Sequence, residues 1–267
     1  MKKWWPGLCI TALVLSACTN SEISSQAQDT GTPTELTVFA AASLTESLNM
    51  IKENYEAEHP EIELVYNFDS SGTLQTQIEE GAICDLFISA GQKQMDALGD
   101  LVLTDSRVDL LENAVVLVVP KHAENVPSSF DELANAPSIA LGNSDVPVGQ
   151  YAEEILRNMG LWDQLNAEQK ITFGSNVKEV TAQVAAAAVS CGIVYRTDAA
   201  SEPDIAVVAE APADFYSPAV YPAAVLTNAV QPEEAQAFLD YLNTEDAMAI
   251  FSSVGFTRPA MKSAASK

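Results

Sequence analysis

Two turns in the first third of the chain combine serine hydroxyls with the start of an expected helix. Ser43 follows the apolar run 36–42, and Ser71 follows the run 64–68. Each run is typical of a β-strand, and a helical pattern begins directly after it. Such a turn directs unpaired backbone N–H groups toward the carboxyl edge of a parallel sheet. Because neither turn contains Lys or Arg, the pattern favours binding of an anion through neutral donors.

The serines of both turns are also candidate helix caps. Ser43 is followed three residues later by Glu46, which is the spacing of a capping box. We therefore expect Ser43 to cap a helix over 44–57, and either Ser70 or Ser71 to cap the next helix. The apolar residues of the first helix share one face: Leu44, Leu48, Ile51 and Tyr55.

Strands and helices alternate along the chain, which predicts an α/β fold with parallel sheets and covering helices. The expected strands are 36–40, 62–67, 85–89, 114–120, 138–141, 170–173, 192–195, 205–208 and 221–226. The expected helices are 44–57, 73–80, 92–97, 129–133, 150–159 and 177–189, followed by a helix that starts at Pro232 and one that Thr244 caps. The fully apolar run 114–120 is expected inside a sheet, and Pro222 predicts an edge position or a strand start.

The N-terminus has the pattern of a targeting segment. Two lysines precede an apolar run that ends in Leu-Ser-Ala-Cys at Cys18, a pattern that resembles the lipobox of bacterial lipoproteins. We expect residues 1–17 to be a signal peptide, Cys18 to be lipidated, and 18–34 to be a flexible tether. An ordinary cleaved signal with an incidental cysteine is the alternative.

Composition excludes several classes of function. The formal net charge of −24 argues against a nucleic-acid partner. The chain has two histidines and no Cys-x-x-Cys pair, so no zinc site is expected. Serine hydrolase, the enzymatic alternative, is disfavoured because no Gly-x-Ser-x-Gly elbow occurs, and we expect no enzyme and no cofactor. Cys84 and Cys191 precede the expected strands 85–89 and 192–195, which we assign to different halves of the fold, and we expect the two cysteines to be apart and reduced.

Four motifs resemble the molybdate-binding protein of bacterial ABC importers, a family of type II solute-binding proteins. They are VFAAASL at 38–44, FDSSGTL at 68–74, DLFISA at 85–90 and GIVY at 192–195. The resemblance extends from about Leu36 to Thr257. It implies two lobes, each a mostly parallel sheet flanked by helices, with the ligand in the cleft between them. We expect 35–117 and 220–262 to form the first lobe and 118–219 the second, with crossings inside the strands near 115–119 and 221–225. Residues 263–267 are expected to be a tail.

The resemblance also implies the ligand-binding residues. The family's serines align with Ser43 and Ser71, although Gly72 stands where the family often has serine, which leaves Ser70 as the alternative. Val148 and Val177 are expected to donate through their backbone N–H groups, and Tyr195 through its hydroxyl. These donors hold an oxyanion, and no residue is expected to ligate a cation directly. Asp198 and Arg196 are expected to be structural or to help close the lobes.

The function that follows is capture of molybdate, and of tungstate, for delivery to an ABC transporter permease. The protein is expected to be a monomeric lipoprotein on the cell membrane, facing the periplasm or the extracellular side. A tungstate-specific, sulfate or other tetrahedral oxyanion-binding protein is the alternative within the same class.

Overall fold

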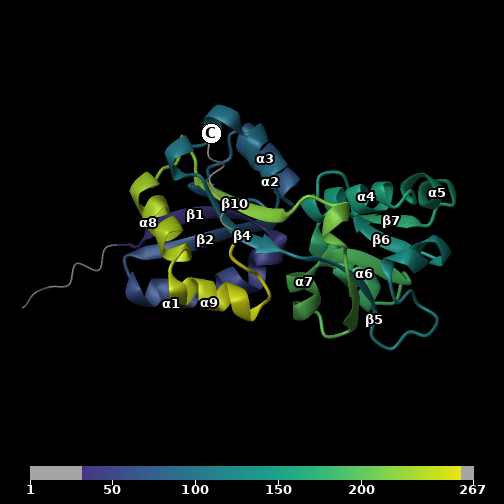
Figure 1. Cartoon of the computed structure of the whole chain (residues 1–267). Coiled ribbons are helices and arrows are strands. Elements are labelled where there is room, and N and C mark those ends of the chain that lie inside the picture. The colour runs from purple at the N-terminus through teal and green to yellow at the C-terminus, as the bar shows by residue number, and fades with distance from the viewer. Residues whose placement is uncertain (1–31, 260–267) are drawn as a thin grey trace, which may run out of the picture. The chain divides into compact units, whose positions relative to one another are not determined.

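The computed structural model describes residues 32–259 of the chain. The expected signal peptide 1–17, the lipidation site Cys18, most of the expected tether 18–34 and the tail 263–267 lie outside the described residues. The described part has two five-stranded sheets flanked by helices (Figure 1). We call the elements of the first sheet, with their helices, the first lobe and those of the second sheet the second lobe. The expected α/β class with two lobes is confirmed.

The first sheet has the strand order β2-β1-β3-β10-β4. Strand β1 is parallel to β2 and β3, whereas β10 is antiparallel to β3 and β4. The bounds are β1 Thr34–Ala41, β2 Ile62–Asp69, β3 Leu86–Ile88, β4 Val108–Asn113 and β10 Ala219–Val225. Because parallel strands end at the same edge of a sheet, the turns after β1, β2 and β3 converge there.

The second sheet repeats this plan with the order β7-β6-β8-β5-β9. Strand β6 is parallel to β7 and β8, and β5 is antiparallel to β8 and β9. The bounds are β5 Val115–Pro120, β6 Ile139–Gly142, β7 Ile171–Gly174, β8 Cys191–Tyr195 and β9 Ile205–Glu210. The apolar strand β5 therefore lies inside a sheet, as expected.

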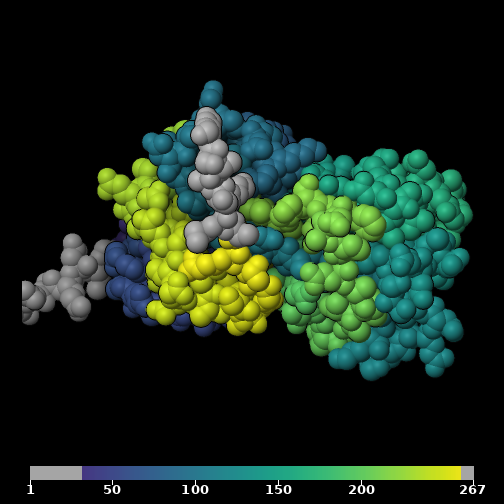
Figure 2. Space-filling model, in the orientation of Figure 1, coloured from purple at the N-terminus to yellow at the C-terminus, as the bar shows by residue number. Residues whose placement is uncertain are grey.

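The α-helices are α1 Thr45–Glu58, α2 Ser71–Glu79, α3 Gln92–Ala97, α4 Pro147–Asn158, α5 Trp162–Ala167, α6 Val177–Ala185, α7 Arg196–Ser201, α8 Pro232–Leu242 and α9 Glu245–Ser253. Short 3-10 helices occupy η1 Ala42–Leu44, η2 Gly99–Leu101, η3 Thr104–Ser106, η4 Phe130–Asn135 and η5 Ala213–Phe215. The C-terminal helix α9 packs against α1, and Figure 2 shows the yellow C-terminal residues beside blue and purple N-terminal ones.

Apolar helix faces build the core of the first lobe. The four residues expected on one face of α1 are all buried, as are four apolar residues that share one face of α8. The latter are Ala235, Phe238, Leu239 and Leu242. Pro232 is the first residue of α8, and the Thr244 hydroxyl caps α9 by accepting from the N–H of Ala247. The helical periodicity of the sequence therefore predicted these contacts correctly.

The passage between the sheets differs from the expectation. The chain leaves β4 of the first sheet and enters β5 of the second across the single residue Ala114, so the change of sheet precedes β5 and does not fall inside it. Likewise the whole of β10 belongs to the first sheet. These observations concern the sheets alone, and the division of the chain into lobes at residues 117 and 220 stays a prediction.

The expected edge or starting position of Pro222 is wrong. Pro222 lies within β10, between β3 and β4, and its carbonyl accepts from the N–H of Ser89. A register shift at Tyr221/Pro222 in the pairing with β4 explains the tolerance, because a bulge accommodates a residue that has no N–H to donate.

Both cysteines of the described part are free and buried, Cys84 two residues before β3 and Cys191 at the start of β8. Burial raises the pKa of each thiol to about 12. They lie in different lobes, so the expectation that they are apart and reduced is confirmed.

Candidate functional site

A small cavity is lined by residues from both lobes. Four of the five residues expected to hold the ligand line it: Ser43, Ser71, Val177 and Tyr195. The remaining lining residues are Ala41, Ala42, Asp69, Ser70, Ala90, Val146 and Pro147. The free volume of the cavity is about 10 Å³, which is room for about one water molecule. The turns after β1, β2 and β3 thus meet the starts of α4 and α6 and the end of β8.

Ser43 does not cap a helix, so the expected capping box with Glu46 is wrong. A 3-10 turn, Ala42–Leu44, is inserted between β1 and α1, and Leu44 stands at the N-cap of α1 without a side-chain cap. The insertion places Ser43 before the helix start, where its hydroxyl cannot accept from the first-turn N–H groups. Its Oγ instead lies 2.9 Å from the hydroxyl oxygen of Tyr221, in a buried contact.

The two serines of the second turn have separate contacts. Ser70 is the N-cap of α2, and its Oγ accepts from the N–H of Thr73 at 3.1 Å. Ser71 is the first residue of α2, is fully buried, and its Oγ accepts from the N–H of Ala90 at 2.9 Å. The capping role therefore belongs to Ser70. Because both serines line the cavity, the choice of ligand serine stays a prediction.

The two expected backbone donors are placed differently. Val177 is the first residue of α6 and lines the cavity, while Asn176 caps that helix by accepting from the N–H of Glu179. Val148 is the second residue of α4 and is fully buried, and the cavity wall at this helix is made by Val146 and Pro147. First-turn N–H groups have no partner within their own helix, so both helix starts direct donors toward this region.

Tyr195 ends β8 at the cavity wall. Its hydroxyl donates to the carbonyl of Ala90 at 3.0 Å, a contact between the second lobe and the first. The side chain is almost fully buried, and this burial raises the pKa of the hydroxyl well above its ordinary value. The group therefore remains a protonated donor throughout the physiological range. A second contact between the lobes joins the N–H of Gly72 to the carbonyl of Asp145 at 3.1 Å.

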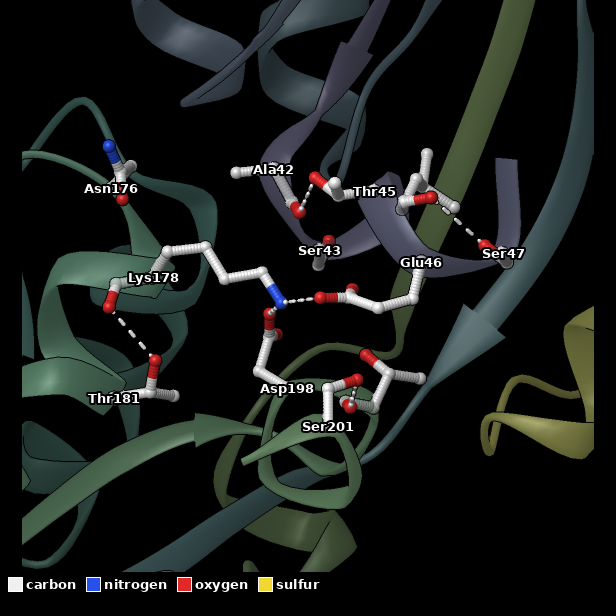
Figure 3. A network of polar contacts seen from close by, with 12 residues as sticks. Ala42, Ser43, Thr45, Glu46, Ser47, Asn176, Lys178, Thr181, Asp198 and Ser201 are labelled. Carbon is white, nitrogen blue, oxygen red and sulfur yellow. Dashed lines mark hydrogen bonds and ion pairs between the residues drawn. The ribbon is translucent and has the colours of Figure 1, made fainter. Parts of the chain in front are cut away.

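One lysine lies beside the cavity, and two carboxyl groups lie close to its ammonium group (Figure 3). Lys178 Nζ is 2.7 Å from Glu46 Oε1, on the first lobe, and 3.5 Å from Asp198 Oδ1, on α7 of the second. Asp198 has no exposed side-chain surface, and burial raises its pKa to about 7 against the opposing effect of Lys178. Sequence reasoning missed Lys178, because nothing local marks a contact across 132 residues.

The electrostatics of the cavity are those of neutral donors. No lysine or arginine appears among its lining residues within 32–259, and the one lining carboxylate, Asp69, accepts from the N–H of Ser70 at 2.7 Å. Over the same range no cluster of His, Cys, Asp or Glu could hold a metal ion, and no helix is long and apolar enough to cross a membrane. Two lobes around such a cavity define a solute-binding protein.

The chain belongs to the family of bacterial extracellular solute-binding proteins, whose sequence profile matches residues 36–257. It is 39% identical over 249 residues to a Bacillus subtilis protein named "Putative ABC transporter substrate-binding lipoprotein YvgL", covering 92% of this chain and 94% of that one. It is 36% identical to the molybdate-binding protein ModA of Haemophilus influenzae, over 84% and 90% of the two chains.

A solved structure of similar fold is the periplasmic molybdate-binding protein of Azotobacter vinelandii. Its TM-score is 0.75 at 22% identity, over 84% of this chain and 100% of that one. The resemblance to molybdate-binding proteins of ABC importers is thus confirmed. Proteins of this family bind solutes outside the cytoplasm.

Proposed function

We propose that this protein captures molybdate, and also tungstate, and delivers the anion to the permease of an ABC importer. The observation that carries the proposal is the donor set of the cavity. Hydroxyl groups of Ser43 and Ser71 meet there with the starts of α4 and α6 and with the Tyr195 hydroxyl, whose hydrogen turns from the carbonyl of Ala90 to the anion on binding. The 36% identity to a protein named as molybdate-binding supports the choice of ligand.

Neutral donors suffice to hold a dianion in such a site. Hydroxyl and backbone N–H dipoles act strongly where water is excluded, and helix N-termini add partial positive charge. Lys178, beside the cavity-lining Val177, is paired with Glu46 at 2.7 Å and lies 3.5 Å from Asp198 (Figure 3). The protein therefore binds the anion through oriented dipoles, and closure of the two lobes removes the competing water.

The proposed donors come from both lobes. Ser43 and Ser71 belong to the first lobe, and the hydroxyl of Tyr195 and the N–H groups of Val148 and Val177 belong to the second. An anion that contacts both sets stabilises the closed arrangement over any open one, because only the closed form offers all donors together. Ligand binding and closure are thereby one equilibrium.

Selection among oxyanions follows from cavity size and from the donor set. Molybdate and tungstate have nearly the same shape, so this site accepts both. Hydrogen phosphate carries a proton that needs an acceptor, which the proposed hydroxyl and N–H donors do not provide, and the one lining carboxylate, Asp69, already accepts from the N–H of Ser70. Sulfate has no such proton, and its discrimination depends on size alone. It is therefore the most informative competitor.

A thermal-shift panel on the purified protein tests the proposal. Molybdate and tungstate should raise Tm, because a ligand at a thousandfold excess over Kd stabilises the folded state by about 4 kcal/mol. Sulfate, phosphate and chromate at the same concentrations serve as comparisons. A shift produced by sulfate and not by molybdate would transfer the protein to the sulfate-binding alternative. No shift with any of the five anions would contradict oxyanion binding altogether.

The proposal includes the attachment of the protein to the membrane. The lipobox-like segment that ends at Cys18 supports a lipid anchor on the outer face of the cytoplasmic membrane, and one relative bears the name of a lipoprotein. A monomer suffices for the binding function, because the described residues of one chain line the entire cavity.

A further inference from the structure

A buried chain of hydrogen bonds leads from between the lobes to Ser43. Asn113, the last residue of β4, donates through Nδ2 to the Thr197 hydroxyl at 2.9 Å and to the Tyr221 hydroxyl at 3.2 Å. The Tyr221 hydroxyl lies 2.9 Å from Ser43 Oγ. All four side chains are buried, and Ser43 alone lines the cavity. The direction of these bonds decides what Ser43 presents to a ligand.

The orientation of the Asn113 amide is fixed by the backbone. Its Oδ1 accepts from the N–H of Ala114 at 2.9 Å, a contact that the amide nitrogen could not make. Nδ2 is therefore the end that faces Thr197 and Tyr221. Its two hydrogens are both used, and the Tyr221 oxygen is an acceptor.

The Tyr221 hydroxyl must then donate its own hydrogen to another acceptor. The residue is fully buried, and a buried hydroxyl hydrogen without an acceptor is costly. Two hydroxyl oxygens adjoin that of Tyr221, those of Ser43 and Tyr195. Ser43 Oγ is the closely placed one, at 2.9 Å, whereas the Tyr195 hydroxyl donates to the carbonyl of Ala90. Ser43 Oγ is thus an acceptor toward Tyr221.

We propose that Asn113 and Tyr221 are positioning residues that direct the hydroxyl hydrogen of Ser43 into the cavity. Because Ser43 Oγ accepts from Tyr221, its single hydrogen is free for another acceptor. The hydroxyl hydrogen of Ser71 is also free for another acceptor, since its Oγ accepts from the N–H of Ala90. Both serines of the cavity are therefore set as donors before any ligand enters.

This inference rests on the proposed function and gives it a basis for specificity. A fully deprotonated oxyanion offers only acceptors and satisfies both serines. A protonated oxyanion that turns its proton toward Ser43 meets a hydrogen there. Without Tyr221, the Ser43 hydroxyl would rotate freely and accept as readily as it donates. Discrimination at this position would then weaken.

A double-mutant cycle between Tyr221→Phe and Ser43→Ala tests the proposal. The phenylalanine keeps the ring packed between Tyr195 and Phe256 while it removes the hydroxyl. We expect Tyr221→Phe to weaken molybdate binding by about threefold to tenfold in calorimetry, a part of the effect of a full hydrogen bond to a charged group. In the Ser43→Ala background the same change should have almost no effect on Kd, because the group that it orients is gone.

The conservative control is Tyr66→Phe, which removes a half-buried hydroxyl that donates to the backbone carbonyl of Leu48 at 3.1 Å. It should leave the Kd for molybdate unchanged. If Tyr221→Phe does not fold, Asn113→Ala replaces it in the double-mutant cycle with Ser43→Ala. In both variants, phosphate should compete more effectively against molybdate than it does in the wild type.

The outcomes separate this inference from the proposed function. An equal loss of affinity from Tyr221→Phe with and without Ser43 would show a merely structural role and would overturn the inference. Unchanged affinity in Tyr221→Phe and Asn113→Ala would do the same. Wild-type protein that binds no tetrahedral oxyanion would instead overturn the proposed function, and the inference with it.

Discussion

Lys178 Nζ lies 2.7 Å from Glu46 Oε1, and this ion pair joins the second lobe to the first at the margin of the cavity. Lys178 directly follows Val177, which lines the cavity, and Glu46 lies in the first turn of α1, close behind Ser43. The pair can form only when the lobes are together. It therefore contributes to closure without touching the proposed ligand.

Glu46→Gln should weaken molybdate binding modestly. Both partners are about one third exposed, with 33% and 40% of the side-chain surface accessible, so solvent screens the pair. Ion pairs of this kind contribute about 0.2–1 kcal/mol, which corresponds to a loss of affinity of at most about fivefold. Calorimetry at low and high salt should show that the difference from wild type shrinks as salt rises.

The matched control is Glu168→Gln. Glu168 pairs with Lys170 at 2.7 Å, and both residues belong to the second lobe. This variant should bind molybdate like the wild type at every salt concentration. Equal effects of the two substitutions would show that the ion pair between the lobes has no part in binding.

Asp198 should make the stability of the protein depend on pH. Its pKa in the folded state is about 7, against an ordinary value of 3.8, chiefly because burial disfavours the charged form. The unfolded chain therefore loses this proton at lower pH than the folded chain, and the group destabilises the fold progressively as pH rises from about 4 to about 7. Asp198→Asn should raise Tm over the wild type by a margin that grows across this interval and stays constant above it.

Thermal denaturation at a series of pH values measures this margin. Asp163→Asn is the comparison, because its side chain is 97% exposed and its pairing with Arg157 spans 3.9 Å. We expect no growing margin for this variant. If the Tm difference between Asp198→Asn and wild type were independent of pH, the Asp198 carboxyl would not titrate in the folded protein as described.

Ser70→Ala and Ser71→Ala should separate capping from ligand binding. Ser70→Ala removes the N-cap of α2 and should lower the free energy of unfolding by about 1 kcal/mol. Its effect on Kd should be small. Ser71→Ala should weaken molybdate binding by about one to two decades, as expected for a hydrogen bond to a charged group. A larger loss of affinity from Ser70→Ala would reassign the ligand serine.

Cys18→Ala tests the lipid anchor. In native cells the wild-type protein should fractionate with membranes, because several acyl chains hold a lipoprotein firmly. The variant should remain unprocessed or become soluble. Wild-type protein found wholly in the soluble fraction would contradict lipidation.

Periodicity along the chain predicted most of the fold, because helix faces and apolar strands are local patterns. Leu44, Leu48 and Ile51 are buried as expected, and the starts of α8 and α9 are where proline and threonine indicated. Strand β4 was missed, because Val108–Asn113 contains charged residues and resembles a loop. Its burial comes from pairing with β10, which is distant in sequence.

The site was less predictable than the fold. Four of the residues that the resemblance implies line one cavity, and their binding of a ligand stays a prediction. The role of Ser43 as a cap failed because the pattern does not reveal an inserted 3-10 turn. The contacts of Ser43 with Tyr221 and of Lys178 with Glu46 span 178 and 132 residues. No local pattern encodes such contacts, since they form only after both lobes have folded.

The most direct test of oxyanion binding in this cavity is calorimetric titration of the wild type, Ser71→Ala and Tyr195→Phe with molybdate at one fixed pH. The wild type should bind a single molybdate, and each variant should bind at least about tenfold more weakly, because each loses one donor to a charged oxygen. Tyr195→Phe keeps its ring packed against Tyr221. Binding of wild-type strength in both variants would place the anion elsewhere, and no binding by the wild type would contradict the proposed function.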